Sequence, residues 1–150
     1  MTMDAKCCES VRVTKIKVEE HGRKAVFLNE EKLEHIKIRV DGCVIKNSTS
    51  ADWVVARESY GDVIIELKGK DVDTAVKQVE ATASHWRSQN YGTGKIAALI
   101  VSTQYPKANT AVRKAQEKFT KVFHGPLHVV TKNYEGCLEA VFSFKGPHKI

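Results

Sequence analysis

Residues 95–103, KIAALIVST, constrain the fold more than any other part of the chain. The run is apolar almost without interruption, which is typical of a strand buried on both faces. A helical pattern precedes it over 71–88, and a second helix is expected after Pro106. A buried strand between two helices predicts an α/β arrangement in which the sheet has a layer on each side.

The first third of the chain has the pattern of strands. Two extended runs flank a turn expected over residues 20–23. Two further apolar runs flank Asp41 and Gly42, and an Asp-Gly pair in that setting predicts a hairpin. A short helix is expected over 29–34, with Asn29 as its N-cap.

The remaining strands complete a mixed sheet. Two are predicted over 51–59 and 61–69, and two more over 127–133 and 137–145. The expected order is a β-meander, a helix, the buried strand, a second helix and two further strands. The predicted fold class is therefore α/β, an α+β mixed sheet, in a single domain of all 150 residues.

Both predicted helices carry apolar residues at helical spacing. Asp71 is a suitable N-cap for the first helix, whose apolar residues are Val72, Ala75, Val76, Val79, Ala83 and Trp86. The second helix has an apolar side of Ala108, Ala111, Ala115 and Phe119. Its other side is basic and is the predicted nucleic-acid-binding surface: Arg113, Lys114, Lys118 and Lys121.

Composition and charge allow a nucleic-acid partner and argue against a membrane protein and a disulfide-rich secreted protein. The net charge of +6 is compatible with a polyanionic partner. No apolar run is long enough for a membrane span, and no secretory signal is expected at the N-terminus. The cysteines show no CxxC spacing or matching histidine pair, so free thiols in the cytoplasm are expected rather than a disulfide framework or a zinc site: Cys7, Cys8, Cys43 and Cys137.

The strand predicted over 61–69 carries charge at its end. Side chains two residues apart in a strand share a face, so Ile64, Glu66 and Lys68 point one way. Val63, Ile65 and Leu67 point the other way and form an apolar core face. A glutamate and a lysine thus lie together on the opposite face, where the strand ends.

The preceding strand brings a second acid to this face. A three-residue loop Ser59-Tyr60-Gly61 would place Gly61 where a bulged turn needs a left-handed residue. That register sets Asp52 opposite Lys68 and diagonal to Glu66. A two-residue Tyr60-Gly61 loop would instead send Asp52 to the other face.

Two carboxylates and an ammonium group on one face suit phosphodiester chemistry. Carboxylate oxygens with waters favour Mg²⁺ or Mn²⁺. Such an ion activates water and stabilises charge on a phosphate, and the lysine orients the attacking water or neutralises the phosphorane. The sequence therefore predicts a site for phosphodiester hydrolysis at Asp52, Glu66 and Lys68.

This pattern resembles the PD-(D/E)xK nuclease superfamily, which has the restriction-endonuclease-like fold. Asp52, thirteen residues and then Glu66-Leu67-Lys68, followed by a helix and a buried strand, are in the order of that family over about residues 35–105. The resemblance implies that Asp52, Glu66 and the carbonyl of Leu67 bind the metal. It also implies that Lys68 is the catalytic lysine.

The same resemblance extends to Gln78, on the helix after the motif, which corresponds to a glutamine near the site in RecB-like members. Two features depart from the family pattern. Ala51 replaces the usual proline, and strands replace the helix that often supplies a further acid. Only Glu30, Glu31 or Glu34 could supply that acid, and the sequence does not distinguish among them. A site without it could bind one metal ion or be inactive.

The resemblance implies a Mg²⁺- or Mn²⁺-dependent nuclease acting on DNA, as an endonuclease or exonuclease, and a homodimer is common among single-domain members. The alternative is an inactive nuclease-fold protein that serves as a nucleic-acid-binding module or as an immunity-type module with a protein partner. RNA is a further candidate substrate, because the motif does not distinguish the two sugars.

Overall fold

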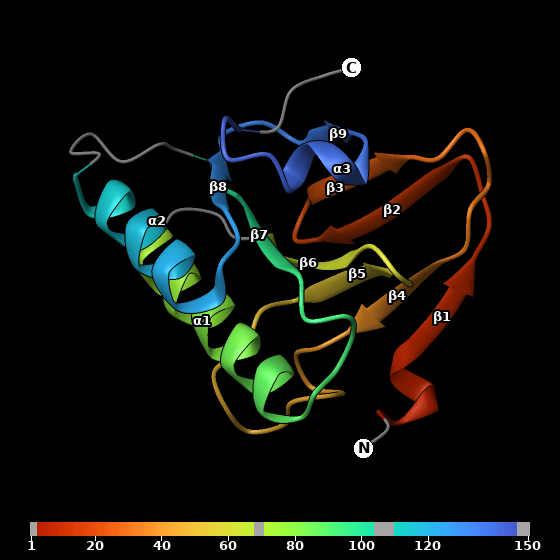
Figure 1. Ribbon diagram of the computed structural model, residues 1–150, viewed down its shortest axis with the longest axis horizontal. Helices are drawn as coiled ribbons and strands as arrows, with labels where there is room; N and C mark the ends of the chain where they lie inside the picture. Colours follow the sequence, from red (N-terminus) through yellow and green to blue (C-terminus); the bar gives the residue numbers. More distant parts are fainter. Residues whose placement is uncertain (1–2, 68–70, 104–109, 147–150) are drawn as a thin grey trace.

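The computed structural model describes residues 3–67, 71–103 and 110–146, which form three layers (Figure 1). A six-stranded mixed sheet lies in the middle. Two long helices cover one of its faces, and a three-stranded sheet with a short helix covers the other. The predicted α/β mixed sheet is thus confirmed.

The large sheet has the strand order β1-β4-β5-β6-β7-β8. Its first three pairings are antiparallel, and the pairings of β6 with β7 and of β7 with β8 are parallel. Parallel neighbours require crossover connections, which the two long helices provide. The strands are β1 (Cys8–Val11), β4 (His35–Arg39), β5 (Trp53–Arg57), β6 (Gly61–Leu67), β7 (Ile96–Val101) and β8 (Leu127–Val130).

The small sheet has the order β2-β3-β9. Strands β2 (Lys15–Glu20) and β3 (Arg23–Leu28) form a hairpin whose tip, His21 and Gly22, confirms the turn predicted there. Strand β9 (Tyr134–Gly136) pairs in parallel with β3. The inner face of this sheet packs on the large sheet through Ile16, Val18, Ala25 and Phe27.

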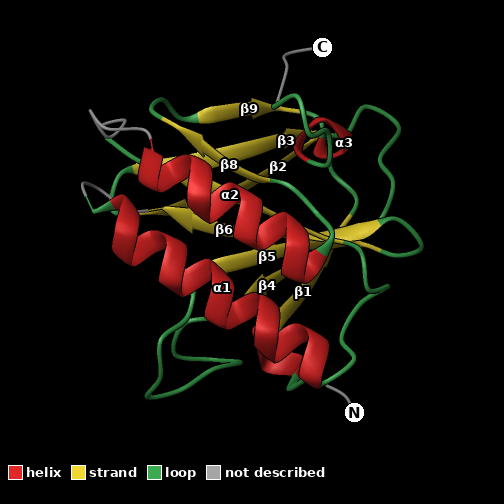
Figure 2. Ribbon diagram, turned by 60° about the vertical axis from the view of Figure 1, so that its left-hand side comes forward, coloured by secondary structure: helices red, strands yellow, loops and turns green. Residues whose placement is uncertain are grey.

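The long helices α1 (Val72–Ser88) and α2 (Thr110–Phe123) lie side by side over the large sheet (Figure 2). Asp71 caps α1 as predicted, because its Oδ1 accepts from the backbone N–H of Thr74 at 3.1 Å. The apolar stripe of α2 consists of Val112, Phe119 and Phe123. Ala111, expected on that side, is exposed, and Ala108 lies outside the described residues.

Apolar cores on both sides of the large sheet explain why β7 is an uninterrupted run of apolar residues. All six residues of Ile96–Val101 are buried, with alternate side chains facing the helices and the small sheet. No helix within 3–67, 71–103 and 110–146 is long and apolar enough to cross a membrane.

Two predictions for the N-terminal region are wrong. No helix forms over 29–34; the Asn29 side chain instead donates to the carbonyls of Val13 and Leu33 and so fixes a turn. Gly42 has φ of +77°, as a turn requires, but no strand follows it. The backbone over 40–45 closes on itself instead, because the N–H groups of Cys43 and Ile45 both donate to the carbonyl of Val40.

The last predicted strand is also wrong. Residues 137–145 contain a third helix, α3 (Leu138–Val141), rather than a strand. Leu138, Val141 and Phe142 have helical spacing, and all three are buried against the large sheet. The turn expected between 127–133 and 137–145 instead holds β9, which lies in the small sheet, while β8 lies in the large one.

The prediction of four free thiols is wrong as well. Cys7, in a short 3₁₀ helix (η1, Ala5–Cys7), forms a disulfide with Cys43, while Cys8 and Cys137 are free. The two bridged cysteines are 36 residues apart, so their proximity depends on tertiary structure and not on a local motif. The cytoplasmic location stays a prediction, without the support that it drew from free thiols.

Candidate active site

The β5–β6 turn sets the register of the two acids. Arg57 pairs with Gly61 and Trp53 with Ile65, so the loop is Glu58-Ser59-Tyr60 rather than the predicted Ser59-Tyr60-Gly61. The left-handed residue is Ser59, at φ of +66°. Gly61 is a glycine for another reason: a Cβ there would lie 2.7 Å from the Phe142 ring.

This register corrects the position of Asp52. One residue beyond the Trp53–Ile65 pair, Asp52 is opposite Glu66 and not opposite Lys68. Residues that are directly opposite share a face, so the predicted common face of Asp52 and Glu66 is retained. Lys68 lies outside the described residues.

Hydrogen bonds hold Asp52 against the end of β6. Its Oδ2 accepts from the backbone N–H of Leu67 at 2.9 Å, and its own carbonyl accepts from the N–H of Val40 at 3.0 Å. The carboxylate therefore lies next to the residue that follows Glu66. Asp52 therefore lies at the Glu66 end of β6 and on the same face. That one ion bridges the two acids stays a prediction.

Several groups act on the Asp52 carboxyl. Burial raises its pKa, while the Leu67 N–H favours the charged form and lowers it. The nearby acids Glu20 and Asp41 raise the pKa further, and His21 lowers it. Because acidic groups gather around a partly buried carboxyl, a proton or a cation is favoured at this position.

Glu66 lies beneath the surface, at 2% exposure, on the face of β6 that packs on α1. Gln78 of α1 faces it: with its amide nitrogen toward the strand, Gln78 donates to Glu66 Oε2 at 3.1 Å and to the Thr74 carbonyl at 3.3 Å. The structure thus brings Asp52, Glu66, Leu67 and Gln78 together. The helical crossover after β6 is what carries the glutamine over the acid.

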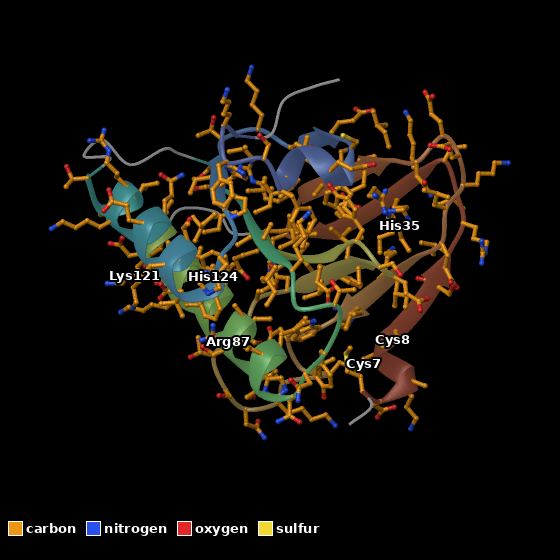
Figure 3. All side chains as sticks on the ribbon, in the orientation of Figure 1. Cys7, Cys8, His35, Arg87, Lys121 and His124 are labelled. Atoms are coloured by element: carbon orange, nitrogen blue, oxygen red, sulfur yellow. A yellow bond between two sulfur atoms is a disulfide. The ribbon has the colours of Figure 1, made fainter. Side chains whose placement is uncertain are left out.

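The predicted basic residues form a separate surface. All four are exposed on α2: Arg113, Lys114, Lys118 and Lys121. Lys118 pairs with Glu80 of α1 at 3.7 Å. Lys121 lies in the last turn of α2, where Arg87 of α1 donates to the Val122 carbonyl; Figure 3 labels Lys121, Arg87 and His124.

The candidates for a further acid lie away from Asp52. Glu30 and Glu31 line a cavity of about 400 Å³ with Arg57, at the other end of β5. Glu34 accepts from Ser10 and pairs with Arg12 at 3.7 Å.

Glu20, at the tip of the β2–β3 hairpin, is instead an acid that acts on Asp52. Sequence reasoning missed it because the docking of that hairpin has no local signal.

The donor set suits a hard divalent cation. Two carboxylates, a backbone carbonyl and water are oxygen ligands of the kind that Mg²⁺ and Mn²⁺ take. Within the part of the chain that the structure describes, no group of three or more His, Cys, Asp and Glu side chains converges as a metal cluster. A metal at this site would therefore depend on Asp52 and Glu66, completed by main-chain oxygen and solvent.

No family model, no curated protein and no solved structure matches this chain.

Proposed function

We propose that the protein is a metal-dependent nuclease that hydrolyses phosphodiester bonds, with DNA as the first substrate to test. The observation that carries this proposal is the 2.9 Å bond from the Leu67 N–H to Asp52, which brings a second carboxylate to the strand end that holds Glu66. A strand end with two acids, one of them buried, favours a proton or a bound cation at that position.

Each residue has a defined part in this proposal. Asp52 and Glu66 would hold Mg²⁺ or Mn²⁺, and the carbonyl of Leu67 would be a third ligand. The ion would supply a Lewis acid that lowers the pKa of bound water and offsets charge on the phosphate. Gln78 orients Glu66 through its amide, and Lys68 is proposed to lie near the attacking water.

The test is a cleavage assay with wild-type protein on plasmid, linear and branched DNA and on RNA. Each substrate is incubated with Mg²⁺, with Mn²⁺ or with EDTA. We expect cleavage that requires the ion and is abolished by Asp52→Asn, while Lys17→Ala, a change on the outer face of β2, cleaves as wild type does. A wild-type protein that binds DNA but cleaves none of these substrates would instead be the inactive nuclease-fold module.

A further inference from the structure

A guanidinium and an ammonium group lie over one indole ring at the Asp52 end of the sheet, on the face that packs on the small sheet. The Cζ atom of Arg39 is 4.4 Å from the centroid of the Trp53 ring, and the Lys37 Nζ is 5.5 Å from it. Both cations come from β4, and Arg39 pairs with Trp53 in the β4–β5 ladder. Because side chains alternate along a strand, Trp53 and the two cations project from the face opposite Asp52 and Glu66. The two sides meet at the end of the sheet, where Glu20, the partner of Arg39, also acts on Asp52.

Contacts within the protein fix the Arg39 guanidinium, and it still has N–H donors available for a ligand. Its Nη1 donates to Glu20 Oε1 at 2.9 Å, and its side chain is still 51% exposed. Guanidinium carries five N–H donors in a planar fork that matches a phosphate. Stacking on Trp53 and pairing with Glu20 fix the plane of this fork and so reduce the entropy lost when an anion binds.

The acidic charges at this end of the sheet favour a protein cation where a polyanionic substrate approaches. Asp52, Glu66, Glu20 and Asp41 are all acidic and lie at or near the site. A phosphodiester approaching four acids is repelled unless positive groups lie along its path. Arg39 and Lys37 lie on the face of the sheet opposite α2, so they are distinct from the basic surface predicted on that helix.

We propose that Arg39, stacked on Trp53, tied to Glu20 and supported by Lys37, binds a backbone phosphate of the nucleic-acid strand at the Asp52 end of the sheet. This inference rests on the proposed function, because it takes nucleic acid as the ligand. It assigns the contact to the β4–β5 ledge (Lys37, Arg39 and Trp53) rather than to α2.

Binding can be measured without cleavage. Fluorescence anisotropy of a labelled DNA duplex is recorded with Glu66→Gln protein in Mg²⁺, over a range of salt concentrations. Adding Arg39→Ala should weaken binding about tenfold and reduce the slope of log affinity against log salt by about 1, as expected for one lost phosphate contact. Arg39→Lys should lie between the two, because it keeps the charge and loses the fork.

Lys17→Ala is the matched control. Lys17 is also ion-paired, with Glu19 at 3.6 Å, and its side chain is 55% exposed. The Lys17→Ala substitution removes the same charge from the outer face of the small sheet, so the affinity for DNA should change less than about twofold. Arg113→Ala tests the rival surface on α2. If thermal melting shows that the Arg39→Ala protein does not fold, DNA binding is measured with the Lys37→Ala and Arg39→Lys proteins instead.

The outcomes separate this inference from the proposed function. Equal binding by the Arg39→Ala and Lys17→Ala proteins, or a larger loss from Arg113→Ala, overturns the inference and leaves the nuclease activity standing. Binding that depends on Arg39 in a wild-type background that cleaves no substrate supports the inference and overturns the activity. A wild-type protein that binds no nucleic acid overturns both.

Discussion

Strand β6 carries a buried acid at each end, and the two have opposite surroundings. Asp62 and Glu66 are four residues apart, share the face that packs on the helices, and are 3% and 2% exposed. Asp62 accepts from the indole N–H of Trp86 at 2.8 Å and is covered by Gly92. Glu66 instead faces the amide of Gln78, and the next residue bonds to Asp52.

The difference shows that burial of a carboxyl does not by itself mark a functional site. Asp62 has a neutral aromatic donor and an apolar surround, and burial raises its pKa to about 6. Glu66 faces the polar amide of Gln78 and lies opposite Asp52 in the β5–β6 register. We infer that the first acid supports the fold and that the second belongs to the candidate site.

The largest expected effect separates the two acids by activity. Glu66→Gln should lower the cleavage rate by about a hundredfold or more, because it removes a ligand charge from the site. Asp62→Asn, the same change of group on the same strand face, should leave the rate within about twofold. Initial rates of plasmid cleavage in Mg²⁺ measure both. Equal losses in the two variants would mean that the ends of β6 do not differ in function.

The disulfide should stabilise the whole fold and, in addition, the Asp52 end of the large sheet. Cys43 lies in the 40–45 turn, whose Val40 donates to the carbonyl of Asp52. Cys43→Ser should lower the free energy of unfolding by about 3 kcal/mol and shrink the rise in melting temperature that Mg²⁺ produces. Cys137→Ser, at a free thiol, is the control. A thiol reductant should lower the melting temperature of wild type and not that of Cys43→Ser.

Stability at the other end should depend on pH through Asp62. Its pKa is raised from 3.8 to about 6, so the folded state keeps a proton that the unfolded chain releases between these values. The free energy of unfolding should therefore fall as pH rises from about 4 through 6, by about 2 kcal/mol from this group. Asp62→Asn should remove that dependence and be the more stable protein at pH 7. Urea unfolding at pH 4, 5, 6 and 7 tests this, and an unchanged profile would contradict it.

The smallest expected effect concerns the glycine that covers Asp62. Gly92 has φ of +69°, and a Cβ there would lie 2.3 Å from Asp62 Oδ2. Gly94 also has positive φ, at +92°, but a Cβ there would meet nothing within 4 Å. Both alanine variants lose about 1 kcal/mol to backbone strain, and Gly92→Ala should lose about 1 kcal/mol more through the clash. Urea midpoints compare them, and equal midpoints would show that Asp62 can move aside.

Local sequence patterns predicted the central strands and the first long helix, but not the long-range contacts around Asp52. The apolar run of β7, the alternation along β6 and the cap at Asp71 are visible in the sequence because each depends on neighbours within a few residues. The pairing of Cys7 with Cys43 and the approach of Glu20 to Asp52 depend on tertiary structure, which no short segment encodes.

The β5–β6 turn shows how a local rule can mislead at the site itself. Gly61 fits a bulged turn by its sequence, but the Phe142 ring from the far end of the chain is what excludes a side chain there. The loop is Glu58-Ser59-Tyr60, with Ser59 as its left-handed residue, so the register differs by two residues from the predicted one and Glu66 rather than Lys68 lies opposite Asp52. The shared face survived because a shift of two residues restores the alternation.

The parallel pairing of Ala25 with Tyr134 has a consequence for synthesis. A ribosome delivers the β2–β3 hairpin before residues 29–133, and β9, the strand that completes its sheet, emerges only after them. Until then the nascent hairpin presents Phe27 without the Tyr134 ring that packs on it, at 5.7 Å between centroids. During synthesis the apolar face of the hairpin is therefore exposed for a time, and in that time it can bind chaperones or aggregate.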